Sequence, residues 1–175
     1  MDNVKLVLAS SNHGKLEELR SLLSGSGIEL IAQSDLGVED AEETGTTFVE
    51  NALLKARHAT RITGLPALAD DSGICVDALQ GAPGLYSARY AGEHGNAARN
   101  IDKLLDALRD VPEAGRTAHF YCVLVLLRHA EDPQPLIVGG EWRGRILDTS
   151  RGQGGHGYDP VFLGPTYGLS AAEMD

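Results

Sequence analysis

The run Thr117–Arg128 constrains the fold of this chain more than any other segment. Its first residues alternate between polar and apolar side chains, and the run then becomes continuously apolar. This pattern is typical of a central strand, which is buried on both faces of a sheet over much of its length. We therefore expect a β-sheet in which this run is one of the inner strands.

Shorter patterns along the chain predict further strands and three helices. The amphipathic patterns predict helices from Lys15 to a stop at 24–27, from the N-cap Thr47 to about Thr60, and over 97–108. Apolar runs predict strands at Val4–Ala9, Ile28–Ala32, Leu65–Ala69, Ile74–Leu79, Pro135–Gly140, Glu141–Leu147 and Val161–Leu163. Strands that alternate with helices indicate an α/β protein, and 175 residues fit a single domain over 1–175.

Charge and composition narrow the class of protein. The net charge of −10, from 15 Lys and Arg against 25 Asp and Glu, argues against a nucleic-acid polymer bound through a basic surface. No apolar run approaches the ~18 residues of a membrane span, and Met1–Asn3 lacks the basic start of a signal peptide. Cys75 and Cys122 each lie in an apolar setting, which predicts buried thiols in a reducing compartment. We therefore expect a cytoplasmic protein.

Two adjacent carboxylates follow a short apolar run. Leu65–Ala69 predicts a buried strand, and Asp70 and Asp71 stand where that strand is expected to end, followed by Ser72 and Gly73. Carboxylates at the carboxyl end of a strand occupy the place where α/β sheets commonly carry chemistry. Asp, Ser and Gly also form surface turns, and this segment by itself favours a turn.

The loop between the first expected strand and helix has the features of an anion site. It consists of Ser10, Ser11, Asn12, His13 and Gly14. Lys15 then begins the helix, where backbone N–H groups and the helix dipole favour a phosphate. It is not a Walker A loop, because Ala9 and Leu16 occupy the places of the required Gly and Ser or Thr. A capped helix start with a solvated lysine fits this stretch equally well.

Charged residues also gather around the start of the second helix. Glu42 and Glu43 belong to the acidic stretch 33–45, for which a solvated loop is the alternative interpretation. Asn51 and Lys55 are four residues apart on the helix and therefore share a face. A lysine paired with an asparagine after an acidic loop makes this face a candidate ligand site.

A glycine-rich segment lies near the end of the chain. Residues 152–157 contain four glycines, which allow close approach of the backbone to a ligand, and Tyr158-Asp159-Pro160 stiffens the far end. A flexible surface loop is the alternative. Together, two lysines, several carboxylates and this loop are the kinds of group that bind a polyphosphate and its Mg²⁺ ion.

Five motifs occur in one order along almost the whole chain. They are Ser10-x-Asn12-x-x-Lys15, Glu43-x-Gly45-x-x-Phe48-x-x-Asn51-Ala52-x-x-Lys55-Ala56, Ala69-Asp70-Asp71-Ser72-Gly73, Gly81-x-Pro83-Gly84-x-Tyr86-Ser87-Ala88-Arg89 and Gly157-Tyr158-Asp159-Pro160-x-Phe162. In these motifs the chain resembles the inosine triphosphate pyrophosphatase family, which hydrolyses ITP, dITP and XTP to the monophosphate and pyrophosphate. The resemblance implies an elongated mixed β-sheet flanked by helices, in two lobes with a central cleft for the nucleotide, a fold related to that of Maf proteins. It also implies Mg²⁺ dependence and a homodimer.

The motif set suggests a role for each candidate residue. Asp71, together with Glu42 or Glu43, is expected to hold Mg²⁺. Asp71 is also the expected general base for the attacking water, with Asp70 as the alternative. Lys15 and Lys55 would offset the charge of the phosphates. The expected substrate-binding residues are Ser10, Ser11, Asn12, His13, Gly14, Lys15, Lys55, Ser72, His156, Gly157, Tyr158 and Asp159.

The chain departs from the family pattern at two places. His156 stands where the family usually has Phe as a stacking partner for the base. The family closes with a Lys and a Ser-His-Arg motif on a C-terminal helix, and we expect this sequence, which ends at Asp175, to lack that helix. The rival interpretations are a Maf-like pyrophosphatase of pyrimidine or modified nucleotides, a P-loop kinase, which Ala9 and Leu16 disfavour, and a catalytically poor nucleotide-binding protein.

Overall fold

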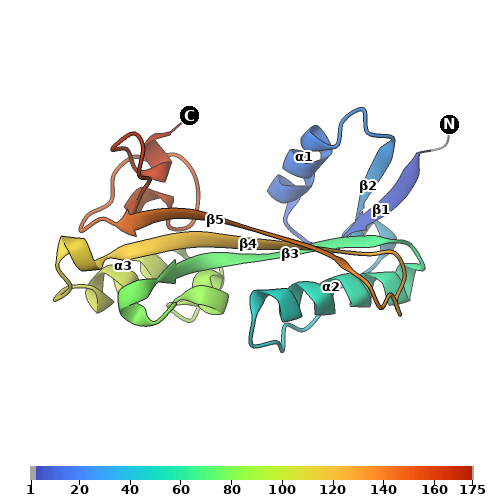
Figure 1. The fold of residues 1–175 in the computed structure, drawn as a ribbon, viewed down its shortest axis with the longest axis horizontal. Coiled ribbons are helices and arrows are strands. Elements are labelled where there is room, and N and C mark those ends of the chain that lie inside the picture. Colours follow the sequence, from blue (N-terminus) through green and yellow to red (C-terminus); the bar gives the residue numbers. More distant parts are fainter. Residues whose placement is uncertain (1–2, 175) are drawn as a thin grey trace. The chain divides into compact units, whose positions relative to one another are not determined.

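Six strands form one mixed sheet in the computed structural model, which describes residues 3–174 (Figure 1). The strand order is β2-β1-β3-β4-β5-β6, with β1 parallel to both β2 and β3 and with β5 antiparallel to β6. The strands are β1 (Val4–Leu8), β2 (Ile28–Ala32), β3 (Ala67–Val76), β4 (Thr117–Leu127), β5 (Leu136–Ile146) and β6 (Phe162–Leu163). The predicted α/β class and the inner position of β4 are confirmed.

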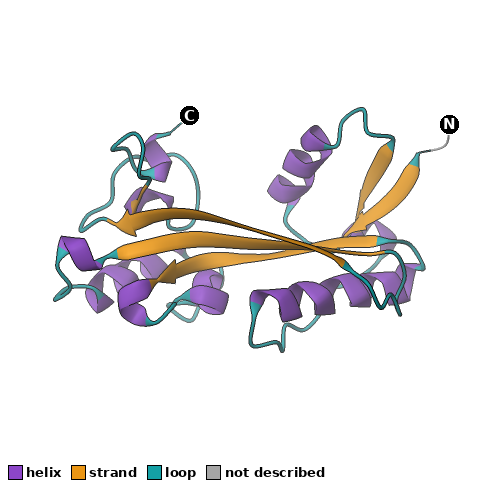
Figure 2. Ribbon diagram, viewed as in Figure 1, coloured by secondary structure: helices purple, strands orange, loops and turns teal. Residues whose placement is uncertain are grey.

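Three α-helices connect these strands: α1 (His13–Leu22), α2 (Phe48–Thr63) and α3 (Ala97–Ala107) (Figure 2). α2 begins with the predicted capping box, in which Thr47 and Glu50 each accept a backbone N–H of the other. It runs three residues past Thr60 and ends at Gly64, whose φ of 69° suits glycine. α1 begins two residues before Lys15, because the side chain of Asn12 caps the helix by accepting the Lys15 N–H.

Two predicted strand breaks are wrong. The two predicted strands Leu65–Ala69 and Ile74–Leu79 are parts of one strand, β3, which ends at Val76 and is followed by a 3-10 helix over Asp77–Leu79. Asp70 and Asp71 therefore lie inside a strand and form neither its end nor a turn. Asp is rare in strands by propensity, but tertiary contacts of the two carboxylates outweigh that preference here. Pro135–Gly140 and Glu141–Leu147 likewise form one strand, β5, whose backbone pairs with β4 and β6 on its two sides.

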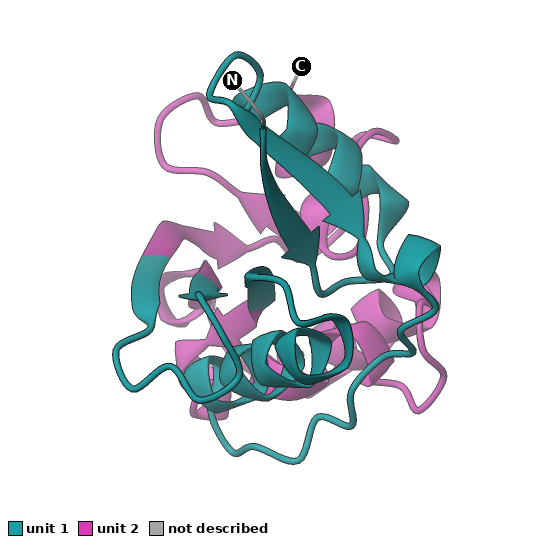
Figure 3. Cartoon of the chain, turned by 90° about the vertical axis from the view of Figure 1, so that its right-hand side faces the viewer, with its two compact units in different colours: residues 1–71, 123–139 teal, residues 72–122, 140–175 magenta. Residues whose placement is uncertain are grey.

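The chain divides into two compact units, which match the two expected lobes and are coloured separately in Figure 3. Unit 1 contains residues 1–71 and 123–139, and unit 2 contains residues 72–122 and 140–175. Each unit has a hydrophobic core of its own. In unit 1, Leu16 of α1 packs against Leu6 and Leu8 of β1 and against Leu30 of β2. The core of unit 2 contains Ile74, Val76, Ile101, Leu104, Leu108, Ala118, Ile146, Tyr158, Val161 and Phe162.

The two cysteines differ in exposure. Cys75 is half-buried, and burial raises the pKa of its thiol. Cys122 is exposed, so the prediction of a buried thiol is wrong at this position. Apolar neighbours in the sequence could not show which face of β4 Cys122 lies on, because successive side chains of a strand point to opposite faces. Within residues 3–174, no helix has both the length and the apolar character that a membrane crossing requires.

Candidate active site

The adjacent carboxylates of β3 contact lysines of two different helices. Lys15 of α1 donates a hydrogen bond from Nζ to Asp70 Oδ2 at 2.5 Å, and Nζ of Lys55 on α2 lies 3.7 Å from Asp71 Oδ1. Successive side chains of a strand point to opposite faces of the sheet. In agreement, α1 and α2 lie on opposite sides of β3 in unit 1 (Figure 1). The strand therefore presents one carboxylate to each helix.

The Asp70 side combines a buried acceptor with a partly exposed cation. Asp70 is 4% exposed, whereas the side chain of Lys15 is 36% exposed. The second carboxylate oxygen, Asp70 Oδ1, is buried and accepts no hydrogen bond from the described part of the chain. A buried acceptor without a donor costs free energy, so this oxygen marks a point where a bound donor or cation would be stabilised.

The loop before α1 exposes its backbone at the start of the helix. Residues 11–14 are all exposed, and Ser10 is half-buried. The backbone N–H of Asn12 donates to Ser10 Oγ at 3.1 Å, while Asn12 Oδ1 accepts the N–H of Lys15 at 3.2 Å. These bonds hold the loop in one conformation at the positive end of the helix dipole. Anion binding by residues 10–15 stays a prediction, which this position at the start of a helix supports.

Two carboxylates meet at Lys55. Its Nζ lies 3.1 Å from Glu43 Oε1 as well as 3.7 Å from Asp71 Oδ1. The three side chains are mostly buried, with exposed fractions of 17% for Lys55, 31% for Glu43 and 13% for Asp71. Glu42, in contrast, forms no ion pair within residues 3–174. Between the two glutamates considered from the sequence, this geometry favours Glu43.

Asn51 positions the acidic loop, a role that sequence reasoning missed. Its side chain is buried, and Asn51 Oδ1 accepts the backbone N–H of Gly45 at 2.8 Å. A Cβ atom added to Gly45 would lie only 2.6 Å from that oxygen, so a glycine is required at this position. The bond anchors the chain two residues after Glu43. The motif that contains Glu43, Gly45 and Asn51 was the available signal, but Asn51, together with Lys55, was interpreted from the sequence as part of a ligand-binding face.

The donor set fits a magnesium ion held by few protein ligands. Among the described residues, no three His, Cys, Asp or Glu side chains gather at metal-binding distances. Mg²⁺ usually takes only one or two protein carboxylates and completes its shell with water and phosphate oxygens. Glu43 and Asp71 meet this requirement, because both approach the single ammonium group of Lys55. Glu43, Asp70 and Asp71 outnumber the two lysines, which leaves one negative charge for a cation to neutralise.

The predicted base-contacting segment lies in unit 2 and has one fully exposed side chain. His156 is 98% exposed, and its backbone N–H donates to Asp159 Oδ2 at 2.9 Å. Gly157 has a φ of 59°, a left-handed conformation that favours glycine. Tyr158 points into the core, where its hydroxyl donates to the Ser87 carbonyl at 2.6 Å and burial raises its pKa. Its ring is a packing element, and the contact of 156–159 with a base stays a prediction.

Comparison with known proteins places these residues in a family. The model of the Ham1 family matches residues 6–175. A protein of Xanthomonas axonopodis pv. citri named dITP/XTP pyrophosphatase is 67% identical over 98% of this chain and 86% of its own length. A protein of Shigella flexneri with the same name is 60% identical over 97% of this chain and 86% of its own length.

Solved structures agree with the sequence comparisons. A HAM1 protein from Coxiella burnetii superposes with a TM-score of 0.95 and 49% identity, covering 98% of this chain and 87% of the other. A nucleoside-triphosphatase, dITP/XTP pyrophosphatase, from Mycobacterium abscessus superposes with a TM-score of 0.87 and 42% identity, covering 98% and 89%. The resemblance inferred from the motifs is confirmed, and this chain belongs to the Ham1 family.

Proposed function

We propose that this protein hydrolyses the noncanonical purine nucleotides dITP, XTP and ITP to the monophosphate and pyrophosphate. The names of relatives that are 60–67% identical support this activity. The observation that carries the proposal is the arrangement on β3, where Asp70 and Asp71 each contact a lysine from a different helix. Cations and carboxylates in this arrangement suit a substrate that brings several negative charges and a reaction that needs a proton acceptor.

The phosphates would bind to the ammonium groups and to the loop before α1. Lys15 is the more exposed lysine, and it adjoins the exposed backbone of 11–14, so it can contact a phosphate while Asp70 keeps it in place. Lys55 is held by Glu43 and Asp71 and would lie beside the reacting phosphate. Ser10, Asn12 and the exposed Ser72 would add hydrogen bonds. Such fixed cations stabilise charge that develops on the phosphoryl oxygens in the transition state.

Asp71 is the general base in this proposal. Its carboxylate would take a proton from a water molecule as the water oxygen forms a bond to the α-phosphorus. The bond from that phosphorus to the bridging oxygen breaks at the same time, and pyrophosphate leaves with the bonding electrons. A general base typically contributes ~10²–10⁴-fold in rate. The second carboxylate, Asp70, is engaged with Lys15 on the other face of the strand, so it is better placed to orient that lysine.

Glu43 and Asp71 would hold a magnesium ion. When bound, the ion would neutralise part of the negative charge on the substrate phosphates. Lys55 contacts both carboxylates, so its ammonium group offsets part of their charge when no ion is bound. Removal of divalent ions with a chelator should therefore abolish turnover without unfolding the protein.

Selection of the base would depend on the 6-oxo group that inosine and xanthosine carry and adenosine lacks. A hydrogen-bond donor at this group rejects adenine, because a mismatched amino group leaves buried polar atoms unsatisfied. His156 is the exposed side chain of the segment assigned to the base, so it is the residue we propose to stack on or bind the purine. The proposal includes a homodimer that acts on the cytoplasmic nucleotide pool, and analytical ultracentrifugation tests its oligomeric state.

Release of pyrophosphate tests the function. The purified protein is assayed with Mg²⁺ and dITP, ITP, XTP, ATP, GTP, dUTP or UTP. We expect efficient turnover of the first three and at least a ~10²-fold lower kcat/KM for ATP, since unsatisfied polar groups discriminate at least this strongly. Preference for dUTP or UTP would instead support a Maf-like activity. Release of inorganic phosphate with ADP from ATP would contradict the pyrophosphatase assignment.

A further inference from the structure

Arg116 in unit 2 is a buried cation whose hydrogen bonds go to backbone carbonyl oxygens. It is 9% exposed, and its guanidinium donates to the carbonyl oxygens of Leu108 at 2.8 Å, Val111 at 2.8 Å and Leu147 at 3.3 Å. No carboxylate within residues 3–174 forms an ion pair with it. A guanidinium has five N–H donors, so two remain after these three bonds. Burial of a charge without a counter-charge is costly, which makes this position favourable for an anion.

Arg116 lines a cavity together with two further arginines. The cavity has a volume of about 280 Å³, and Arg145 and Arg151 contribute to its wall. Arg145 pairs with Glu113 at 2.6 Å. Arg151 is exposed and forms no ion pair in the described chain. Two of the three guanidinium groups thus form no ion pair with a carboxylate in the described part of the chain.

The charge of the cavity is opposite to that of the protein as a whole. The chain carries a net charge of −10, but the cavity has three arginines against Glu113 and Asp148. Planar guanidinium groups bind phosphate oxygens with paired hydrogen bonds, so several of them in one cavity favour a phosphate. The volume of about 280 Å³ lies at the lower end of the ~300–1,000 Å³ range of typical ligand pockets, and it has room for a small inorganic anion.

We propose that the cavity lined by Arg116, Arg145 and Arg151 binds phosphate or pyrophosphate. None of these residues belongs to the carboxylate and lysine groups of the candidate active site, so the proposal goes beyond the proposed function and is independent of it. Pyrophosphate would use the guanidinium groups of Arg116 and Arg151 directly. Arg145 would contribute to the extent that Glu113 releases it, because the carboxylate and the ligand compete for the same donors.

Calorimetric titration with pyrophosphate and with phosphate tests this site. The full chain carries Lys15→Gln and Lys55→Gln and is titrated with a chelator present, so that binding at the candidate active site is suppressed. In this background we expect one remaining binding event. Arg151→Gln should weaken it by at least ~10-fold, because a hydrogen bond between charged groups is worth that much in affinity. Glu113→Gln should strengthen binding, since it removes the competing carboxylate.

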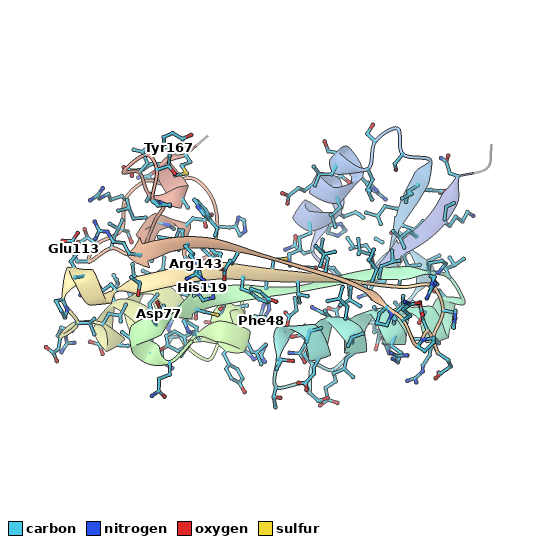
Figure 4. The ribbon with its side chains drawn as sticks, in the orientation of Figure 1. Phe48, Asp77, Glu113, His119, Arg143 and Tyr167 are labelled. Carbon is cyan, nitrogen blue, oxygen red and sulfur yellow. The ribbon has the colours of Figure 1, made fainter. Side chains whose placement is uncertain are left out.

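Arg143→Gln is the matched control. Arg143 lies on β5 like Arg145, but it pairs with Glu141 at 2.6 Å and does not line the cavity. Figure 4 labels Arg143 and Glu113, which belong to different ion pairs of unit 2. The side chains of Glu113, Arg143 and Arg151 are exposed, so their substitution should not change the fold of the background protein, and circular dichroism shows whether that background and each variant are folded. Equal affinity in the Arg151→Gln and Arg143→Gln proteins would overturn the proposal. So would the absence of any binding at millimolar anion, whether or not the protein hydrolyses nucleotides.

Discussion

Replacement of Asp71 by asparagine tests which of the two adjacent carboxylates accepts the proton. Asparagine keeps the size of the side chain and can still contact Lys55, but its amide cannot take a proton from water. Asp71 contacts Lys55, which also contacts Glu43. Asp70 is instead bound to Lys15 on the opposite face of β3. The two substitutions should therefore affect the reaction differently.

The expected magnitude follows from the role of each carboxylate. Loss of a general base lowers kcat by ~10²–10⁴-fold, which corresponds to about 3–5 kcal/mol in the activation barrier. Asp70→Asn removes the negative charge that holds Lys15, while Asp71 stays available as the proton acceptor. We expect this variant to retain at least ~10-fold more kcat than Asp71→Asn and to change mainly the KM.

Steady-state release of pyrophosphate from dITP measures both effects at saturating Mg²⁺. Far-ultraviolet circular dichroism and urea unfolding show whether each variant is folded, and equilibrium binding of the nucleotide shows whether the site is intact. An Asp71→Asn protein that keeps more than a tenth of the wild-type kcat would refute the assignment. A larger loss of kcat in Asp70→Asn than in Asp71→Asn would assign the base to Asp70.

Two further pairs of variants test the packing of unit 2, and one of them has a pH dependence. Gly144→Ala should destabilise the protein by more than ~2 kcal/mol, because an added Cβ would overlap the Leu163 carbonyl of β6. Gly140→Ala, on the same strand with open space around it, should change the free energy of unfolding by less than ~0.5 kcal/mol; urea denaturation measures both, and equal effects would contradict the reasoning. Tyr158→Phe should cost about 1 kcal/mol, because a buried carbonyl loses its hydroxyl donor, whereas the exposed Tyr167 should tolerate the same change. Burial raises the pKa of Tyr158 above its unfolded value near ~10, so its neutral form stabilises the fold below pH ~10. That contribution is lost as pH rises further, and the wild type should lose stability faster than Tyr158→Phe above pH ~10; parallel curves would show that the hydroxyl does not titrate with unfolding.

Local patterns were sufficient for several elements and for the family. The capping box at Thr47 and Glu50 predicted the start of α2 to the residue, because both hydrogen bonds form within one turn. The periodic apolar residues of 97–108 predicted α3, and the apolar run that begins at Thr117 predicted β4. The motifs around Lys15, Lys55 and Asp70-Asp71 predicted the family, and the comparisons confirmed that prediction. In each case the signal lies within a short stretch of chain.

The arrangement of the candidate site depended on contacts between distant segments. Asp70 and Asp71 looked like the end of a strand because Asp, Ser and Gly favour turns, but lysines 55 and 16 residues earlier in the chain hold the two carboxylates within β3. Likewise, only the structure shows that Glu43 contacts Lys55 and that the Gly45 N–H, two residues later, donates to Asn51 on the same helix as Lys55. The sequence by itself determined the three helices, the inner strand β4 and the residue types available for the site. Only the tertiary structure decided that the adjacent carboxylates contact different helices, because that outcome requires the alternation of β3 and the packing of α1 and α2 on its opposite sides.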